Sequence, residues 1–168
     1  MIEPESAEQF TFRRATDGDV ATIVEFNVQL ALETEGKSLN PETIQQGVSR
    51  GIQQFPEAQY FIAEFERQLV GQLMFTREWS DWRNGWMLWL QSVYVRQDFR
   101  RKGVFRNLLN SALAVVNKDS GAVGLRLYVE KENEPAIAAY ERLQFKDTDY
   151  RILETVPIAD EVQALRTF

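Results

Sequence analysis

The chain has 168 residues, 44% of them hydrophobic and 26% charged, with a formal net charge of −6, and this balance predicts one globular domain over residues 1–168. Because the sequence holds no cysteine and no histidine, disulfides, thiolate metal sites, a cysteine nucleophile and the commonest general base are excluded, and we expect no metal. The acidic balance argues against a nucleic-acid partner, and since no apolar run reaches the roughly 18 residues of a membrane span and the N-terminus lacks the features of a signal peptide, we expect a cytoplasmic protein with no membrane partner.

The first third of the chain predicts one strand followed by two helices. Residues 9–15 alternate as a short strand. Asp17 and Asp19 can cap the first helix, and Asn40 before a proline predicts a second helix over residues 41–52. One face of the first helix carries Val20, Ile23, Val24, Leu30 and Ala31, interrupted by the polar Asn27.

The middle of the chain predicts three strands. Residues 58–79 are typical of two strands around a tight turn at Glu66 and Arg67. Asn84-Gly85 is a strong hairpin signal. The nearly uninterrupted apolar run over residues 86–95 predicts a strand buried on both faces.

The last third predicts a helix after Gly103, a strand over residues 124–130, a helix over 133–145 and a last strand over 149–156. The whole order favours an α+β (mixed α/β) fold, with a mixed sheet that carries helices on its faces.

The stretch FRRKGVFR, residues 99–106, surrounds one glycine with cations at the predicted start of a helix. Free N–H groups at a helix start and the helix dipole bind anions, and Gly103 lets the backbone approach an oxygen closely. Neither a GxxxxGK[ST] nor a GxGxxG pattern is present. The pattern therefore predicts a diphosphate held mainly by backbone; a solvated basic loop with a capping glycine is the alternative.

Two segments resemble those of one enzyme family. VYVRQDFRRKGVFRNLL resembles the acyl-CoA-binding segment of the GNAT superfamily of N-acetyltransferases, Gln/Arg-x-x-Gly-x-Gly/Ala, in which Arg100 and Gly103 match and Phe105 replaces a small residue. LRLYVEKENEPAIAAYERLQF resembles the second segment, a strand followed by Asn-x-x-Ala-x-x-x-Tyr-x-x-x-Gly-Phe. Its matching residues are Asn133, Ala136, Tyr140 and Phe145, with Gln144 in place of the glycine. Taken alone, Asn133 is better explained as an N-cap and Tyr140 as a core aromatic.

The resemblance implies a GNAT fold, which has a central, mostly antiparallel twisted sheet, a splayed parallel strand pair and helices on both faces. Acetyl-CoA would lie between the splayed strands, here residues 86–95 and 124–130, and no metal is needed. The implied cofactor-binding residues are Val93, Tyr94, Val95, Arg100, Arg101, Lys102, Gly103, Val104, Phe105, Arg106, Asn133 and Tyr140.

The implied reaction is direct attack of an amine on the thioester in a ternary complex, because no cysteine is available to carry the acyl group. An N–H near Val93 would stabilise the oxyanion, and Tyr140 would protonate the leaving thiolate. The predicted catalytic residues are Tyr140, Glu33 and Glu78, with one of the carboxylates, or water, as the base.

The acceptor is predicted to be a small primary amine, polyamine- or amino-acid-like. ALETEG, residues 31–36, resembles the acceptor-side helix of polyamine and thialysine acetyltransferases. Carboxylates and tryptophans suit an ammonium group, although each carboxylate taken singly is better explained as a solvated surface residue and the tryptophans are equally explained by packing within the hairpin. The predicted substrate-binding residues are Glu33, Glu35, Trp79, Asp81 and Trp82. A peptide or protein acceptor and a non-catalytic acyl-CoA sensor are the alternatives, and the family resemblance also favours a homodimer.

Overall fold

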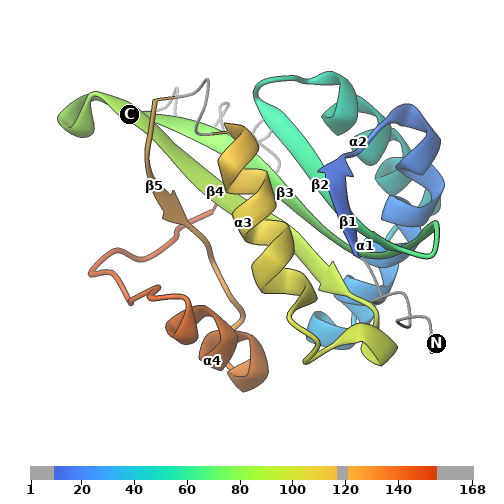
Figure 1. The fold of residues 1–168 in the computed structure, drawn as a ribbon. Helices are drawn as coiled ribbons and strands as arrows, with labels where there is room; N and C mark the ends of the chain where they lie inside the picture. Colours follow the sequence, from blue (N-terminus) through green and yellow to red (C-terminus); the bar gives the residue numbers. More distant parts are fainter. Residues whose placement is uncertain (1–9, 117–120, 155–168) are drawn as a thin grey trace, which may run out of the picture. The chain divides into compact units, whose positions relative to one another are not determined.

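The computed structural model describes residues 10–116 and 121–154 (Figure 1). The elements of this part are, in chain order, β1 (Thr11–Arg14), the 3₁₀ turn η1 (Asp17–Asp19), α1 (Val20–Glu35), α2 (Pro41–Gln53), β2 (Ala58–Phe65), β3 (Gln68–Ser80), η2 (Asp81–Arg83), β4 (Gly85–Val95), η3 (Gln97–Phe99), α3 (Val104–Val116), β5 (Ala122–Arg126) and α4 (Glu134–Arg142). The chain divides into two units, Met1–Glu132 and Asn133–Phe168. The first holds the sheet and α1 to α3, and the second holds α4; the single domain stays a prediction.

The sheet of the first unit has the strand order β1-β2-β3-β4-β5. Every neighbouring pair is antiparallel except β4 and β5, which run parallel. Their register begins at Trp86–Ala122 and ends at Trp89–Arg126, whereas β4 continues to Val95. The predicted α+β fold with a mostly antiparallel sheet and one parallel strand pair is therefore confirmed, although β5 covers Ala122–Arg126 and not the predicted residues 124–130.

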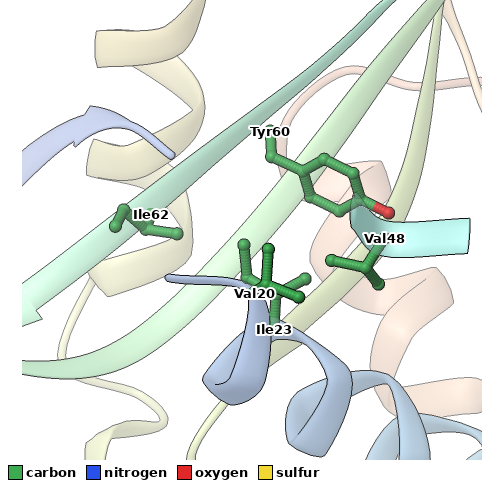
Figure 2. Close-up of a cluster of buried hydrophobic side chains, with 5 residues drawn as sticks. All are labelled: Val20, Ile23, Val48, Tyr60 and Ile62. Carbon is green, nitrogen blue, oxygen red and sulfur yellow. The ribbon is translucent and has the colours of Figure 1, made fainter. Parts of the chain in front are cut away.

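The two faces of the sheet carry different helices (Figure 1). From Gly71 onward, odd-numbered residues of β3 face α3, since a Cβ on Gly71 would lie 3.5 Å from the Val104 side chain. Even-numbered residues face α1, because Gln72 bonds Asn27. The core under α1 and α2 is formed by Val20, Ile23, Val48, Tyr60 and Ile62, which point toward one another in Figure 2. Helices thus cover both faces, as predicted, and β2 and β3 contact helices on each face.

Local backbone geometry explains several of the expected turns. Glu66 and Arg67 both have positive φ, 49° and 65°, as a tight hairpin turn requires. The Asn40 side chain accepts from the Thr43 N–H at 2.9 Å, so the predicted N-cap of α2 is confirmed. Gly85 was predicted to be a glycine of a tight hairpin turn, but its φ is not positive. Instead, a Cβ on Gly85 would lie 2.3 Å from Val123 Cγ1. Close approach of the two parallel strands is what requires glycine at this position.

Two predictions about local structure are wrong. Asp19 precedes α1, but its carboxylate accepts no bond from that helix and instead binds Thr16 and the Arg13 guanidinium. The strand expected over 149–156 is absent from residues 149–154, where Tyr150 and Leu153 are 77% and 90% exposed. A strand needs a hydrogen-bonding neighbour, and no described strand pairs with this segment. Residues 155 and 156, and the tail over 158–168, lie outside the described residues.

Candidate active site

The edge of β4 beyond its pairing with β5 contains a β-bulge. Gln72 is paired with Tyr94 and Met74 with Gln91, so the single residue between them on β3 opposes both Ser92 and Val93. Ser92 has a φ of +49°. A bulge re-aims the backbone groups around it, and this one lies just past the point where β4 and β5 separate.

A buried polar network holds the bulge. The Gln72 side chain is fully buried, and its Nε2 donates to Asn27 Oδ1 at 3.0 Å and to the Ser92 carbonyl at 3.2 Å. The Tyr60 hydroxyl also bonds Asn27 and Ser92. These bonds lower the pKa of Tyr60, but burial has the larger effect and raises it. Gln72 Oε1 has no partner among the described residues. The polar Asn27, which interrupts the apolar face of its helix, is thus the α1 residue that positions the bulge through Gln72.

The basic turn lies between β4 and α3. The Gly103 carbonyl accepts the Asn107 N–H at 3.0 Å, so Gly103 stands at the N-cap of α3. The N–H groups of the first helical turn have no acceptor within a helix, and those of Val104 and Arg106 are in that turn. Gly103 has a φ of +79°, and an added Cβ would meet only Asn107 Nδ2, at 3.8 Å. Backbone conformation, rather than space, is therefore what requires glycine there.

Cations surround this helix start. Arg101 and Arg106 are exposed, and within the described part of the chain neither has an ion-pair partner. The Lys102 ammonium lies 5.0 Å from the centre of the Phe99 ring. Three positive side chains therefore stand beside the N–H groups of α3, an arrangement that suits an anion.

Arg100 is engaged differently from the other cations of the turn. Its Nε donates to the Val95 carbonyl at 2.8 Å, and its Nη2 donates to Glu33 Oε2 at 2.6 Å. Glu33 Oε1 also accepts from the Tyr94 hydroxyl at 3.3 Å. Burial, and next the charge of Glu33, raise the pKa of Tyr94. Glu33 thus ties α1 to the turn, while the neighbouring Glu35 pairs with Lys37 at the surface.

A second polar cluster spans three strands on the α1–α2 face of the sheet; we call it the Glu78 cluster. Glu78 Oε2 accepts from Trp89 Nε1 at 2.7 Å, and Glu78 Oε1 accepts from Arg126 Nη1 at 2.8 Å. Tyr128 packs its ring 6.1 Å from that of Trp89 and donates its hydroxyl to Gln91 Oε1 at 3.3 Å. Sequence reasoning missed all of these partners of Glu78. Strand alternation predicts which residues of one strand share a face. It does not predict that Glu78, Trp89 and Arg126 lie side by side, because that depends on the register between the three strands.

The hairpin residues predicted at the substrate site lie outside the Glu78 cluster. Trp79 follows Glu78 directly and so points to the opposite face, where its ring meets Trp86 at 5.1 Å. Asp81 accepts the Trp82 N–H at 2.9 Å, and Trp82 is 86% exposed at the hairpin tip. Hairpin packing therefore describes Trp79, and substrate binding by these three residues stays a prediction.

Two predicted residues belong to the second unit. Asn133 Oδ1 accepts the Ala136 N–H at 3.2 Å and caps α4. Tyr140 packs its ring edge-on against Phe145, with 5.7 Å between ring centres, and burial raises the pKa of its hydroxyl to about 12. Like an unperturbed tyrosine, Tyr140 keeps its proton at neutral pH. The roles of both residues toward acetyl-CoA stay predictions.

The sequence model of the Acetyltransferase (GNAT) family matches residues 26–145. The chain belongs to the GNAT family. It is 28% identical over 156 residues to an N-alpha-acetyltransferase of Saccharolobus solfataricus, a match that covers 87% of this chain and 86% of that protein. It is 34% identical over 85 residues to a thialysine N-epsilon-acetyltransferase of Caenorhabditis elegans, covering 51% of this chain and 52% of that protein. A crystal structure of a possible acetyltransferase from Clostridium difficile 630 has a TM-score of 0.80 and 44% identity, over 90% of this chain and 99% of that one.

This GNAT protein is therefore an N-acetyltransferase, and its family uses acetyl-CoA as co-substrate. The first turn of α3, with its N–H groups and exposed cations, fits the diphosphate of coenzyme A. The described residues hold no group of three or more metal-binding side chains. None of the described helices is long and apolar enough to cross a membrane.

Proposed function

We propose that this GNAT enzyme transfers the acetyl group of acetyl-CoA to the primary amine of a small acceptor by direct attack in a ternary complex. The observation that carries the proposal is the Glu78 cluster, which presents a half-exposed carboxylate where β4 and β5 part. A carboxylate beside an indole ring is suited to an ammonium group, by charge pairing and by cation–π contact.

Acetyl-CoA would be held by backbone. The N–H groups at the start of α3 take the diphosphate, with Arg101, Lys102 and Arg106 neutralising its charge. The edge of β4 that lies beyond the pairing with β5 can bond the pantetheine arm in the manner of an added strand. The N–H of Val93, in the bulge, would then stabilise the oxyanion.

In the reaction the amine nitrogen attacks the thioester carbonyl, a C–N bond forms, the C–S bond breaks and CoA leaves as a thiolate. The nitrogen loses a proton and the thiolate gains one. We assign the amine proton to Glu78, directly or through water, because Glu78 bonds Trp89 and Arg126 at the point where β4 and β5 separate, beside the proposed path of the thioester. Tyr140, whose hydroxyl is protonated at neutral pH, is the proposed source of the thiolate's proton.

A peptide N-terminus is the second candidate acceptor. It is supported by the Saccharolobus solfataricus relative, which is named as an N-alpha-acetyltransferase and aligns over most of both chains. The relative from Caenorhabditis elegans, named for thialysine, supports the small acceptor. A homodimer remains a proposal from the family resemblance.

Two measurements test the proposal. Calorimetry should detect binding of acetyl-CoA to the wild type. The double variant Arg101→Gln with Arg106→Gln should bind acetyl-CoA more weakly, because two charges beside the diphosphate are lost. Arg67→Gln, in the exposed β2–β3 turn, is the single-charge control and should bind normally. Free thiol should then appear with small amines. Absence of acetyl-CoA binding, or thiol release with peptides alone, would contradict the proposal.

A further inference from the structure

We propose that Arg126 and Glu78 together select an acceptor whose amine is accompanied by a carboxylate, that is, an amino acid rather than a polyamine. This inference rests on the proposed function, because it concerns the acceptor of that reaction. It goes further in assigning Arg126, which no sequence motif singles out, as the residue that recognises the acceptor's anionic group.

The pair has unused hydrogen-bonding capacity on both sides. Each oxygen of Glu78 accepts one bond, from Trp89 or from Arg126, and a carboxylate has about four lone-pair sites. Arg126 donates one hydrogen bond to Glu78, out of the five N–H donors of a guanidinium. The two side chains are 44% and 28% exposed. A ligand can therefore bind the pair without first breaking it.

The charges form a dipole that matches a zwitterion. Negative Glu78 and positive Arg126 meet at 2.8 Å, so an ammonium against the first and a carboxylate against the second would both be favourable. A guanidinium binds a carboxylate through two parallel hydrogen bonds. A polyamine satisfies Glu78 equally well, but its further positive charges meet Arg126 and are repelled.

The position of the pair fits an acceptor. Trp89 and Arg126 form the last register pair before β4 and β5 separate. The thioester is proposed to lie along β4 from that point, so an amine on Glu78 would be beside it. The rings of Trp89 and Tyr128, 6.1 Å apart, form an apolar wall for the acceptor's own side chain.

A half-exposed ion pair contributes little to stability, so Arg126 can be replaced without unfolding the protein. The test uses leucine, phenylalanine and lysine, each compared with its own amide and with the amine left after decarboxylation. We expect the wild type to favour the amino acid of each trio. Arg126→Gln should lower kcat/KM for the amino acids by about tenfold or more, the loss typical of a charged hydrogen bond, and leave the decarboxylated amines unchanged or improved.

Two further variants make the test specific. Arg126→Lys keeps the charge but not the planar guanidinium. Its kcat/KM for the amino acids should therefore lie between those of the wild type and Arg126→Gln. Arg67→Gln removes one charge from the β2–β3 turn and should change no acceptor's rate. Acetyl-CoA affinity and melting temperature, measured on each variant, should match the wild type and exclude a folding defect.

The inference is overturned if the wild type uses the amides or decarboxylated amines as well as the amino acids. It is also overturned if Arg126→Gln lowers kcat/KM by the same factor for the amino acids, the amides and the decarboxylated amines. Failure of thiol release with every amine would refute the proposed function instead. In that case calorimetric titration of the same acceptors into the CoA-loaded protein decides the inference: tighter binding of amino acids than of amides, lost in Arg126→Gln, supports it, and equal or absent binding overturns it.

Discussion

Replacement of Gln72 by methionine tests whether a buried side chain sets the shape of the bulge in β4. Methionine has a similar length but makes neither of the two hydrogen bonds, to Asn27 and to the Ser92 carbonyl. Each bond contributes about 1 kcal/mol, and removing the partnerless Oε1 returns about 1 kcal/mol, while the two acceptors left behind add a cost. The net loss of unfolding free energy is about 1 to 2 kcal/mol, which lowers the melting temperature by about 3 to 6 °C at this chain length.

The effect on turnover should exceed the effect on stability. Without Gln72 the bulge at Ser92 can relax, and a backbone donor displaced from the oxyanion costs about tenfold or more in kcat. Binding of acetyl-CoA, measured by calorimetry, should change little because the basic turn is untouched.

Gln59→Met is the matched control for this prediction. Gln59 is also a buried glutamine with two hydrogen bonds, one from Arg14 and one to the Pro56 carbonyl, but it lies on β2. This variant should lose stability and keep its kcat. If both variants have the same kcat, or if Gln72→Met melts like the wild type, the bulge does not depend on Gln72 and the reasoning is refuted.

Three other predictions concern the turn, its tie to α1 and the proposed acid. Gly103→Ala forces an L-residue to a φ of +79°, which costs about 1 to 2 kcal/mol, so calorimetry should show severalfold weaker acetyl-CoA binding. The control Gly47→Ala, in a helix with open space around it, should bind acetyl-CoA normally. Equal effects of the two substitutions on binding would disprove the conformational argument. Glu33→Gln should raise the KM for acetyl-CoA severalfold with kcat nearly unchanged, because Arg100 loses its anchor, whereas a loss of kcat alone would make Glu33 the base. Tyr140→Phe should lower kcat by about a hundredfold; since the phenol, with a pKa of about 12, stays protonated throughout, the ratio of wild-type to variant rates should be constant from pH 6 to 9.5, and a ratio that shrinks in this range would contradict the role.

Much of the fold was predictable because its signals are local. The Asn40 cap and the turn at Glu66 and Arg67 involve residues within a few positions of each other, and the structure has both. The prediction of a final strand was wrong because a strand depends on a distant partner. Residues 149–154 have the composition of a strand, but no described strand pairs with them. Composition measures suitability for a sheet, whereas a strand forms only where a partner supplies hydrogen bonds.

The candidate site divides along the same line. The basic turn around Gly103 is a run of consecutive residues, so its charge, its glycine and its place before a helix can all be read from the order of the amino acids. The contacts of Glu33 with Arg100, 67 residues away, and of Glu78 with Arg126, 48 residues away, arise from the folded arrangement of helix and strands. Strand register and helix packing choose these partners, and they depend on contacts across the whole sheet that no local pattern records.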